Sequence, residues 1–215
     1  MQPARRITLT DDVYASLRAM IMDHVVAPGE RVNIDALARR LEVSPTPVRE
    51  ALARLEADGL VDKRPLAGYT ATPLLTRAGF DELVEMRLIL EPAVARRVAA
   101  RRLDPTELAA LRAEADLPDR PEEGGLATFT AQDSRFHHGL AARSGNAMLH
   151  DAVVRLRAHL HLFRLTFPAA HYGVSAREHH RIVAAVAAGD RDAAADAMRA
   201  HIEAAAARHA SYFES

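Results

Sequence analysis

Apolar residues recur at intervals of three and four along the first sixty positions, which is the pattern of helices with one buried face. The first run begins at the capping candidate Thr10 and is stopped near Pro28. A second run covers residues 33–43, and a third covers residues 44–61. Residues 60–74 then read as two short strands around a turn, which predicts a β-hairpin.

Helix, helix, tight turn, helix and hairpin is the order of a winged helix-turn-helix. In that fold the N-terminal residues of the second motif helix reach the major groove of DNA. Arg49 is placed to bond guanine O6 and N7, and Thr46 to bond a phosphate, while Arg39 and Arg40 lie close to the motif. Residues 1–72 carry 10 basic and 10 acidic groups. A small helical subdomain with a solvated arginine face therefore stays an alternative.

The remaining chain shows helical periodicity and no strand pattern. We expect a mostly α protein with two domains, a winged helix-turn-helix with a small β-hairpin wing over 1–74 and an all-α bundle of about six helices over 75–215. The polar stretch 117–125 predicts a loop. The first two expected helices begin at Thr76 and Asp104, and the first has Pro92 inside it, which predicts a bend. A third contains Asp133 and ends near Gly145, a fourth runs from Asn146 to about Pro168, and the last two form a pair around Gly189-Asp190.

Two ionisable side chains share a stripe that should face the core. Asp133 and His137 are one turn apart, between apolar residues of the same helix face. His179 and His201 each lie on an apolar stripe as well, at 11 residues before and 11 residues after Asp190. Equal separation from the turn of an antiparallel helix pair places these two histidines at the same height.

Burying ionisable groups costs several kcal/mol unless something pairs with them. One divalent ion held by three imidazoles and one carboxylate would remove this cost for all four, and an open coordination position would accept a ligand. The alternative is four polar residues that are hydrogen-bonded separately. The neighbours His138 and His180 point about 100° away from the stripes, so they are not candidate ligands.

The composition excludes some kinds of site but does not indicate a function. The formal net charge is −1 and there is no cysteine, which excludes disulfides and thiolate metal sites. No apolar run approaches 18 residues, and the N-terminus lacks the apolar core of a signal peptide, so we expect a cytoplasmic protein. Ten of the 11 histidines follow residue 73, which indicates two regions with different chemistry.

The stretch LARRLEVSPTPVREALARLEADGLV resembles the signature of the GntR family of bacterial transcription regulators. The resemblance implies that Arg49 reads a base, that Ser44 and Thr46 touch the DNA backbone, and that Gly68 lets the wing tip approach the minor groove. Many relatives have arginine where this chain has Pro45, so the operator is expected to differ from theirs. The candidate DNA-binding residues are Arg49, Thr46, Ser44, Arg40 and Gly68.

The C-terminal region resembles the all-α FCD effector domain of the FadR branch of GntR regulators. The matching runs are EMRLILEPAVARRVAA, DSRFHHGLAARSGN, EHHRIVAAVAAGD and AMRAHI. In metal-binding members, D-x-x-x-H and two later histidines hold the ion. The matching positions are the four on the buried stripes, Asp133, His137, His179 and His201. Zinc is the usual ion, and nickel or manganese are alternatives that side-chain identity does not decide.

The resemblance also implies an effector, commonly a small organic acid. Its carboxylate would reach an open metal position and pair with Arg87, because an arginine fork fits a carboxylate. The alternative for Arg87 is an outward residue paired with Glu85 or Glu91. Asn146 is the other candidate for effector contact, although its place before a helix also fits a cap. The bundle of about six helices resembles the VanR-like subgroup.

Together these observations predict a homodimeric transcription regulator, expected to be a repressor, that binds a pseudo-palindromic operator. A metalloenzyme is the rival class, since an open position on such an ion activates water. However, no Glu lies in an H-x-E or H-E-x-x-H arrangement beside the candidate ligands. A second rival is a regulator whose metal is purely structural and whose effector binds elsewhere.

Overall fold

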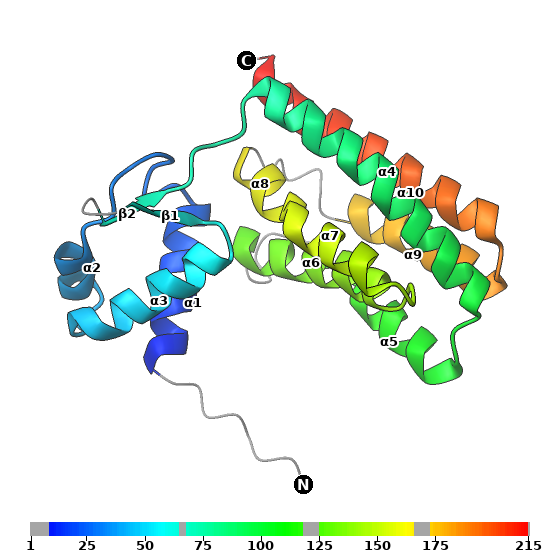
Figure 1. The fold of residues 1–215 in the computed structure, drawn as a ribbon, viewed down its shortest axis with the longest axis horizontal. Coiled ribbons are helices and arrows are strands. Elements are labelled where there is room, and N and C mark those ends of the chain that lie inside the picture. The colour runs from blue at the N-terminus through cyan, green and yellow to red at the C-terminus, as the bar shows by residue number, and fades with distance from the viewer. Residues whose placement is uncertain (1–8, 65–67, 118–124, 166–172, 215) are drawn as a thin grey trace, which may run out of the picture. The chain divides into compact units, whose positions relative to one another are not determined.

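The computed structural model describes residues 9–64, 68–117, 125–165 and 173–214 (Figure 1). The chain divides into two compact units, Met1–Leu74 and Leu75–Ser215. The tip of the expected hairpin turn with Pro65, most of the expected loop at 117–125, and Pro168 lie outside the described residues.

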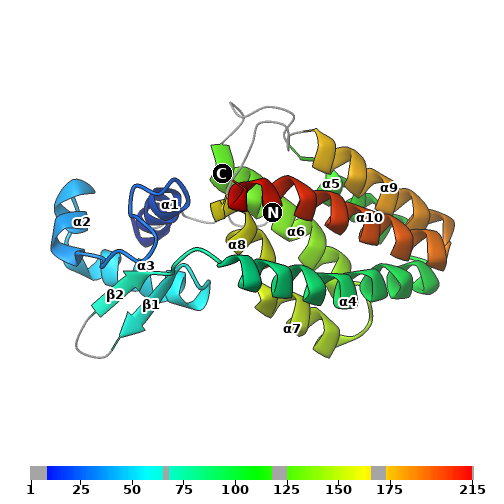
Figure 2. The ribbon, with the colours of Figure 1, turned by 90° about the horizontal axis from the view of Figure 1, so that it is seen from above.

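The first unit contains three helices followed by a hairpin, so the predicted order of a winged helix-turn-helix is confirmed (Figure 2). The hairpin strands pair antiparallel, from Val61 opposite Ala71 to Arg64 opposite Gly68. Helix α3 buries one apolar face, and α1 packs on α3. The elements are α1 (Leu9–Met22), α2 (Ile34–Arg40), α3 (Pro45–Ala57), β1 (Val61–Arg64) and β2 (Gly68–Ala71).

Both ends of α1 differ from the prediction. The helix begins at Leu9, so Thr10 lies inside its first turn and donates its hydroxyl to Glu50 at 2.9 Å instead of capping. The helix ends at Met22 rather than near Pro28. His24 has a left-handed backbone (φ 56°), which no longer continues a helix. Nothing in the residue type of His24 signals that ending.

The second unit is all-α, as predicted, but it holds seven α-helices within the described residues rather than about six. The expected single helix after Asn146 is two, because Arg157 adopts a left-handed conformation (φ 49°) between them. The helices are α4 (Arg77–Arg101), α5 (Pro105–Ala115), α6 (Gly125–Ala142), α7 (Ala147–Leu156), α8 (Ala158–Leu165), α9 (Val174–Ala188) and α10 (Arg191–Ala210), followed by a short 3₁₀ turn, Ser211–Phe213.

Local sequence accounts for most of the helix starts in this unit. Thr76 and Asp190 accept backbone N–H groups at the starts of α4 and α10, and Asp104 forms a complete capping box with Glu107 on α5. Helix α4 continues through the buried Pro92.

Packing between the helices forms the centre of the bundle. Helices α4 and α10 lie side by side and antiparallel, and α9 packs on α10 (Figures 1 and 2). Their apolar faces meet those of α5 and α6 in one core that includes Val98, Leu111, Phe136, Ile182 and Ile202. No helix in the described part of the chain has the length and apolar composition of a transmembrane span.

The capping box of α5 gives a stability prediction. Asp104 accepts the N–H groups of Thr106 and Glu107, each at 2.8 Å. Asp104→Ala leaves these groups without their side-chain acceptor, so the free energy of unfolding should fall by about 1 kcal/mol. Urea denaturation measures the change, with Asp196→Ala, an exposed site within α10, as the control. Equal stability of both variants would contradict a stabilising cap.

Candidate functional site

The first turn of α3 presents three of the candidate DNA-binding residues to solvent. Ser44, Thr46 and Arg49 are exposed, whereas Val48 and Leu52 of the same helix are fully buried. Ser44 occupies the N-cap position without making a side-chain capping bond. The hydroxyls and the guanidinium therefore share one polar helix end, as the sequence predicted from the apolar stripe.

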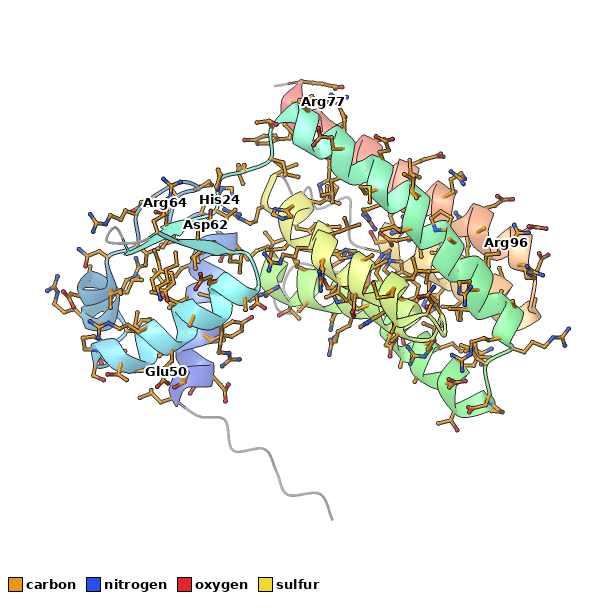
Figure 3. All side chains as sticks on the ribbon, viewed as in Figure 1. His24, Glu50, Asp62, Arg64, Arg77 and Arg96 are labelled. Carbon is orange, nitrogen blue, oxygen red and sulfur yellow. The ribbon has the colours of Figure 1, made fainter. Side chains whose placement is uncertain are left out.

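The other two candidates lie on other elements of the same unit. Arg40 is exposed in the last turn of α2. Gly68 starts β2 with φ +82°, and a Cβ built there meets nothing within 4 Å. Arg64, which ends β1 (Figure 3) opposite Gly68, adds an exposed cation to the hairpin that sequence reasoning overlooked.

The structure brings the four candidate metal ligands together in the middle of the bundle. Asp133 and His137 come from α6, His179 from α9 and His201 from α10, and their exposed fractions are 3 % or less. The ring centroids of His179 and His201 lie 4.8 Å apart, at the common height that their spacing from Asp190 predicts. One ligand atom from each of the three histidines can be chosen so that all lie within 4.8 Å of one another.

Carboxylates fix the orientation of two of these imidazoles. Nδ1 of His137 lies 2.5 Å from Glu91, and Nδ1 of His201 lies 2.8 Å from Glu178. A neutral imidazole that donates from Nδ1 presents a lone pair at Nε2. The two Nε2 atoms lie 3.2 Å apart. Two facing lone pairs repel, so either a proton shared between the two Nε2 atoms or a metal ion bound to both would stabilise this arrangement.

Each of these glutamates is itself held by an arginine. Arg87 donates its Nε to Glu91 at 2.6 Å, and Arg208 donates Nη1 and Nη2 to Glu178, both at 2.8 Å. Arg87 is only 2 % exposed, so the expectation of an outward residue is wrong, while its pairing with Glu91 is confirmed. The carboxylate-to-imidazole bonds are the usual outer support of metal-ligating histidines.

A fifth residue, His159 on α8, completes the cluster and was not predicted. Its Nδ1 lies 2.5 Å from Oδ2 of Asp133, which leaves Oδ1 facing Nε2 of His179 at 3.4 Å. His159 is buried, and with Asp133 and His137 it forms a second group of closely spaced ligand atoms. The sequence does not predict which helix face His159 occupies, because the break at the left-handed Arg157 changes that face.

Burial and charge set the protonation states. Burial lowers the pKa of His137 to about 3, against the raising effect of Glu91, and holds the pKa of His179 well below its usual value. Burial raises the pKa of Glu91, but the charges of Arg87 and His137 and the hydrogen bonds from both residues together outweigh it, and the net pKa is well below the usual value. These shifts favour neutral imidazoles beside an ionised carboxylate, which is the form that metal ligands require.

The residues fit a divalent metal ion. Oδ1 of Asp133 and both ring nitrogens of His179 are buried without a hydrogen-bond partner among the described residues. Buried polar atoms of this kind are rare in native proteins unless an ion, water or ligand satisfies them. Three nitrogens and one carboxylate oxygen are a donor set for zinc, nickel or manganese. His138 and His180 belong to neither group of close ligand atoms, as expected.

A cavity adjoins the cluster and has room for about one water molecule or ion, roughly 10 Å³. Arg87 lines it, but Asn146 does not. Asn146 instead caps α7 by accepting the N–H of Leu149 at 3.1 Å. Thus the structure places the first of the two candidate effector contacts at the cluster and the second at a helix end. The cavity-lining residues include Arg87, Asp133, His159, Ser175, His201 and Arg208.

Comparisons with known proteins agree with this architecture. The description "Bacterial regulatory proteins, gntR family" matches residues 9–70, and "FCD domain" matches residues 82–204. The HTH-type transcriptional regulator YdhC of Bacillus subtilis is 30 % identical over 87 % of this chain and 85 % of its own length. The HTH-type transcriptional repressor RspR of Escherichia coli is 28 % identical over 91 % of this chain and 86 % of its own length.

Solved structures share the fold. The structure of Escherichia coli McbR/YncC aligns with a TM-score of 0.70 at 24 % identity, over 96 % of this chain and 99 % of that chain. The matched families comprise transcription regulators rather than enzymes, so the rival interpretation as a metalloenzyme is set aside. The chain belongs to the gntR family of bacterial regulatory proteins that carry an FCD domain, and it is a DNA-binding transcription regulator.

Proposed function

We propose that residues 1–74 bind operator DNA through the exposed end of α3. Arg49 reads a guanine, Ser44 and Thr46 bond the backbone, and Arg40 contacts a phosphate. Gly68 allows the hairpin tip to approach the minor groove. The exposure of these side chains beside a fully buried apolar face supports the proposal.

The second unit, residues 75–215, holds a divalent ion, with zinc the first choice, on Asp133, His137, His179 and His201. The observation that carries this assignment is the approach of the Nε2 atoms of His137 and His201 to 3.2 Å while carboxylates occupy both Nδ1 atoms. The ion supplies the positive charge that this arrangement lacks. It also offers an open position beside the cavity to an anion.

A small carboxylate effector controls DNA binding by binding at the open position of the ion, which requires the cavity of roughly 10 Å³ to widen. The expectation of the VanR-like subgroup rests on about six helices, and the seven helices of the described residues do not support that placement. We place the protein in the cytoplasm because operator DNA lies there. We expect a repressor, which the name of the relative RspR supports. A purely structural metal with an effector bound elsewhere is the competing proposal, and only a ligand titration of the loaded protein separates the two.

The protein acts as a homodimer on a pseudo-palindromic operator. Exposed apolar side chains on the second unit support a subunit interface there. On α4, Met86 and Ile89 are 42 % and 58 % exposed, and Met148 on α7 is 79 % exposed. Large apolar residues grouped on exposed helix faces favour a partner surface.

Removing the Arg49 guanidinium tests the DNA contact. Arg49→Ala should weaken specific operator binding by about 1–3 kcal/mol, the usual value of a bidentate base contact. Arg54→Ala removes the same charge from the other end of α3 and serves as the matched control. Fluorescence anisotropy with an operator fragment at fixed salt measures both affinities. Equal losses in the two variants would mean that Arg49 contributes only charge.

Metal content tests the ion site. Elemental analysis of the untagged wild-type chain should find about one ion per chain, and His137→Ala and His201→Ala should each lose it. Their melting temperatures should also fall, because an ion that binds only the native state stabilises it. His180→Ala, next to His179 but exposed, should keep the ion. Full occupancy in both buried-histidine variants would remove the proposed site.

The protonation states predict how pH affects the metal-free chain. Below pH 6.5 the unfolded chain protonates its histidines, whereas native His137, with a pKa of about 3, stays neutral. The unfolded state then binds more protons, so the free energy of unfolding falls as pH decreases from 6.5 toward 3. Each such histidine contributes a slope of about 1.4 kcal/mol per pH unit.

His137→Gln should reduce this slope by about one histidine's share between pH 5 and 6. Urea denaturation of chelator-treated protein at several pH values measures it. A slope that the substitution leaves unaltered would indicate that His137 takes up protons in the native state.

A further inference from the structure

A second arginine, Arg208, lines the cavity beside the candidate metal site. It lies on α10, seven residues after His201 and on the same helix face. Both terminal nitrogens of Arg208 donate to Glu178 at 2.8 Å. Its third donor, Nε, is buried and has no hydrogen-bond partner within the described ranges.

This unpaired donor shares the cavity with an unpaired acceptor. Oδ1 of Asp133 is buried and unbonded within the residues that the structure covers, and Asp133 also lines the cavity. An unpaired buried donor on a charged group is costly, and native proteins rarely keep one without a ligand, ion or water to satisfy it. A single water molecule that donates to Asp133 and accepts from Arg208 would satisfy both atoms in the roughly 10 Å³ of this cavity. A divalent ion with a carboxylate oxygen beside it would satisfy them as well, provided that the cavity widens to admit the carboxylate.

The two arginines that line the cavity differ in which of their nitrogens donate to a glutamate. Arg87 uses Nε on Glu91 at 2.6 Å, and its Nη2 lies 3.4 Å from the other oxygen of the same carboxylate. Arg208 uses only Nη1 and Nη2 on Glu178, so its Nε–H remains for a ligand. Arg87 also lines the cavity, and through Glu91 it supports His137.

On this basis, and resting on the metal-centred effector site proposed above, we propose that Arg208 recognises the carboxylate of the effector through its Nε–H. Arg87 has a different task, which is to hold the glutamate that orients His137. The assignment moves effector recognition from α4 to α10. It also means that Arg87→Ala disturbs the metal site itself and does not report on effector binding alone.

The full-length chain loaded with Co²⁺ allows a direct test, because the visible absorption of Co²⁺ responds to anions that enter its surroundings. Acetate is the probe, and its dissociation constant is measured for wild type, Arg208→Gln and Glu178→Gln. Arg208→Gln should keep its cobalt and bind acetate about tenfold more weakly or worse, the usual effect of losing a charged hydrogen bond.

Glu178→Gln is the matched control for a supporting role. Its amide oxygen still accepts from His201 and the Nε–H of Arg208 is kept, so the loss of acetate affinity should be smaller than in Arg208→Gln. Unchanged acetate affinity in Arg208→Gln would overturn the assignment. So would an equal loss in both variants, because Arg208 would then act only through Glu178.

The same experiment separates this inference from the proposed metal site. Cobalt content is measured before acetate is added, so a wild-type chain that binds no cobalt refutes the metal site, and this inference with it. A wild-type chain that holds cobalt but shows no response to acetate refutes the role of Arg208 while the metal site stands.

Discussion

The second unit is built around the cost of placing ionisable side chains inside a helical bundle. A buried charge or unpaired polar atom costs several kcal/mol, comparable with much of the net stability of a domain. Here each of three metal-facing side chains has one atom held by a buried partner: Glu91 holds His137, Glu178 holds His201 and His159 holds Asp133. Among the described residues of this cluster, the polar atoms that still need a partner are few, and they face one another. A single cation meets that shared need, whereas scattered hydrogen bonds would not.

Because these residues come from five helices, the site exists only when the bundle is assembled. Helices α4, α6, α8, α9 and α10 all contribute, and no two neighbouring positions in the sequence provide a preformed metal site beyond the single turn that links Asp133 and His137. Binding of the proposed ion would therefore be linked to folding of the unit: the ion would stabilise the native bundle by mass action, and loss of any helix contact would weaken its binding.

The sequence predicts what depends on periodicity and turns. It predicts the four candidate ligands because each lies on an apolar stripe, and because Gly189 and Asp190 fix the register of α9 against α10. It does not predict the supporting residues with equal ease. Arg208 does carry a signal, since it follows His201 by two helical turns, but an arginine near a chain end fits a solvated position equally well. His159 carries none, because the left-handed Arg157 breaks the helical phase at a residue type that usually continues a helix.

Control of DNA binding requires more than an occupied site. An effector shifts an equilibrium between arrangements of the DNA-binding units only if it binds those arrangements with different affinity. Helix α4 is the element on which such a difference is most easily expressed, since it starts at Arg77, directly after the boundary between the two units, and carries Arg87 and Glu91. A carboxylate recognised by Arg208 on α10 meets an ion whose ligand His137 is oriented from α4 through Glu91. The affinity for the effector would then depend on the position of α4 relative to α10. The same position affects the ion site, through Glu91, and the segment that leads from α4 to the DNA-binding unit.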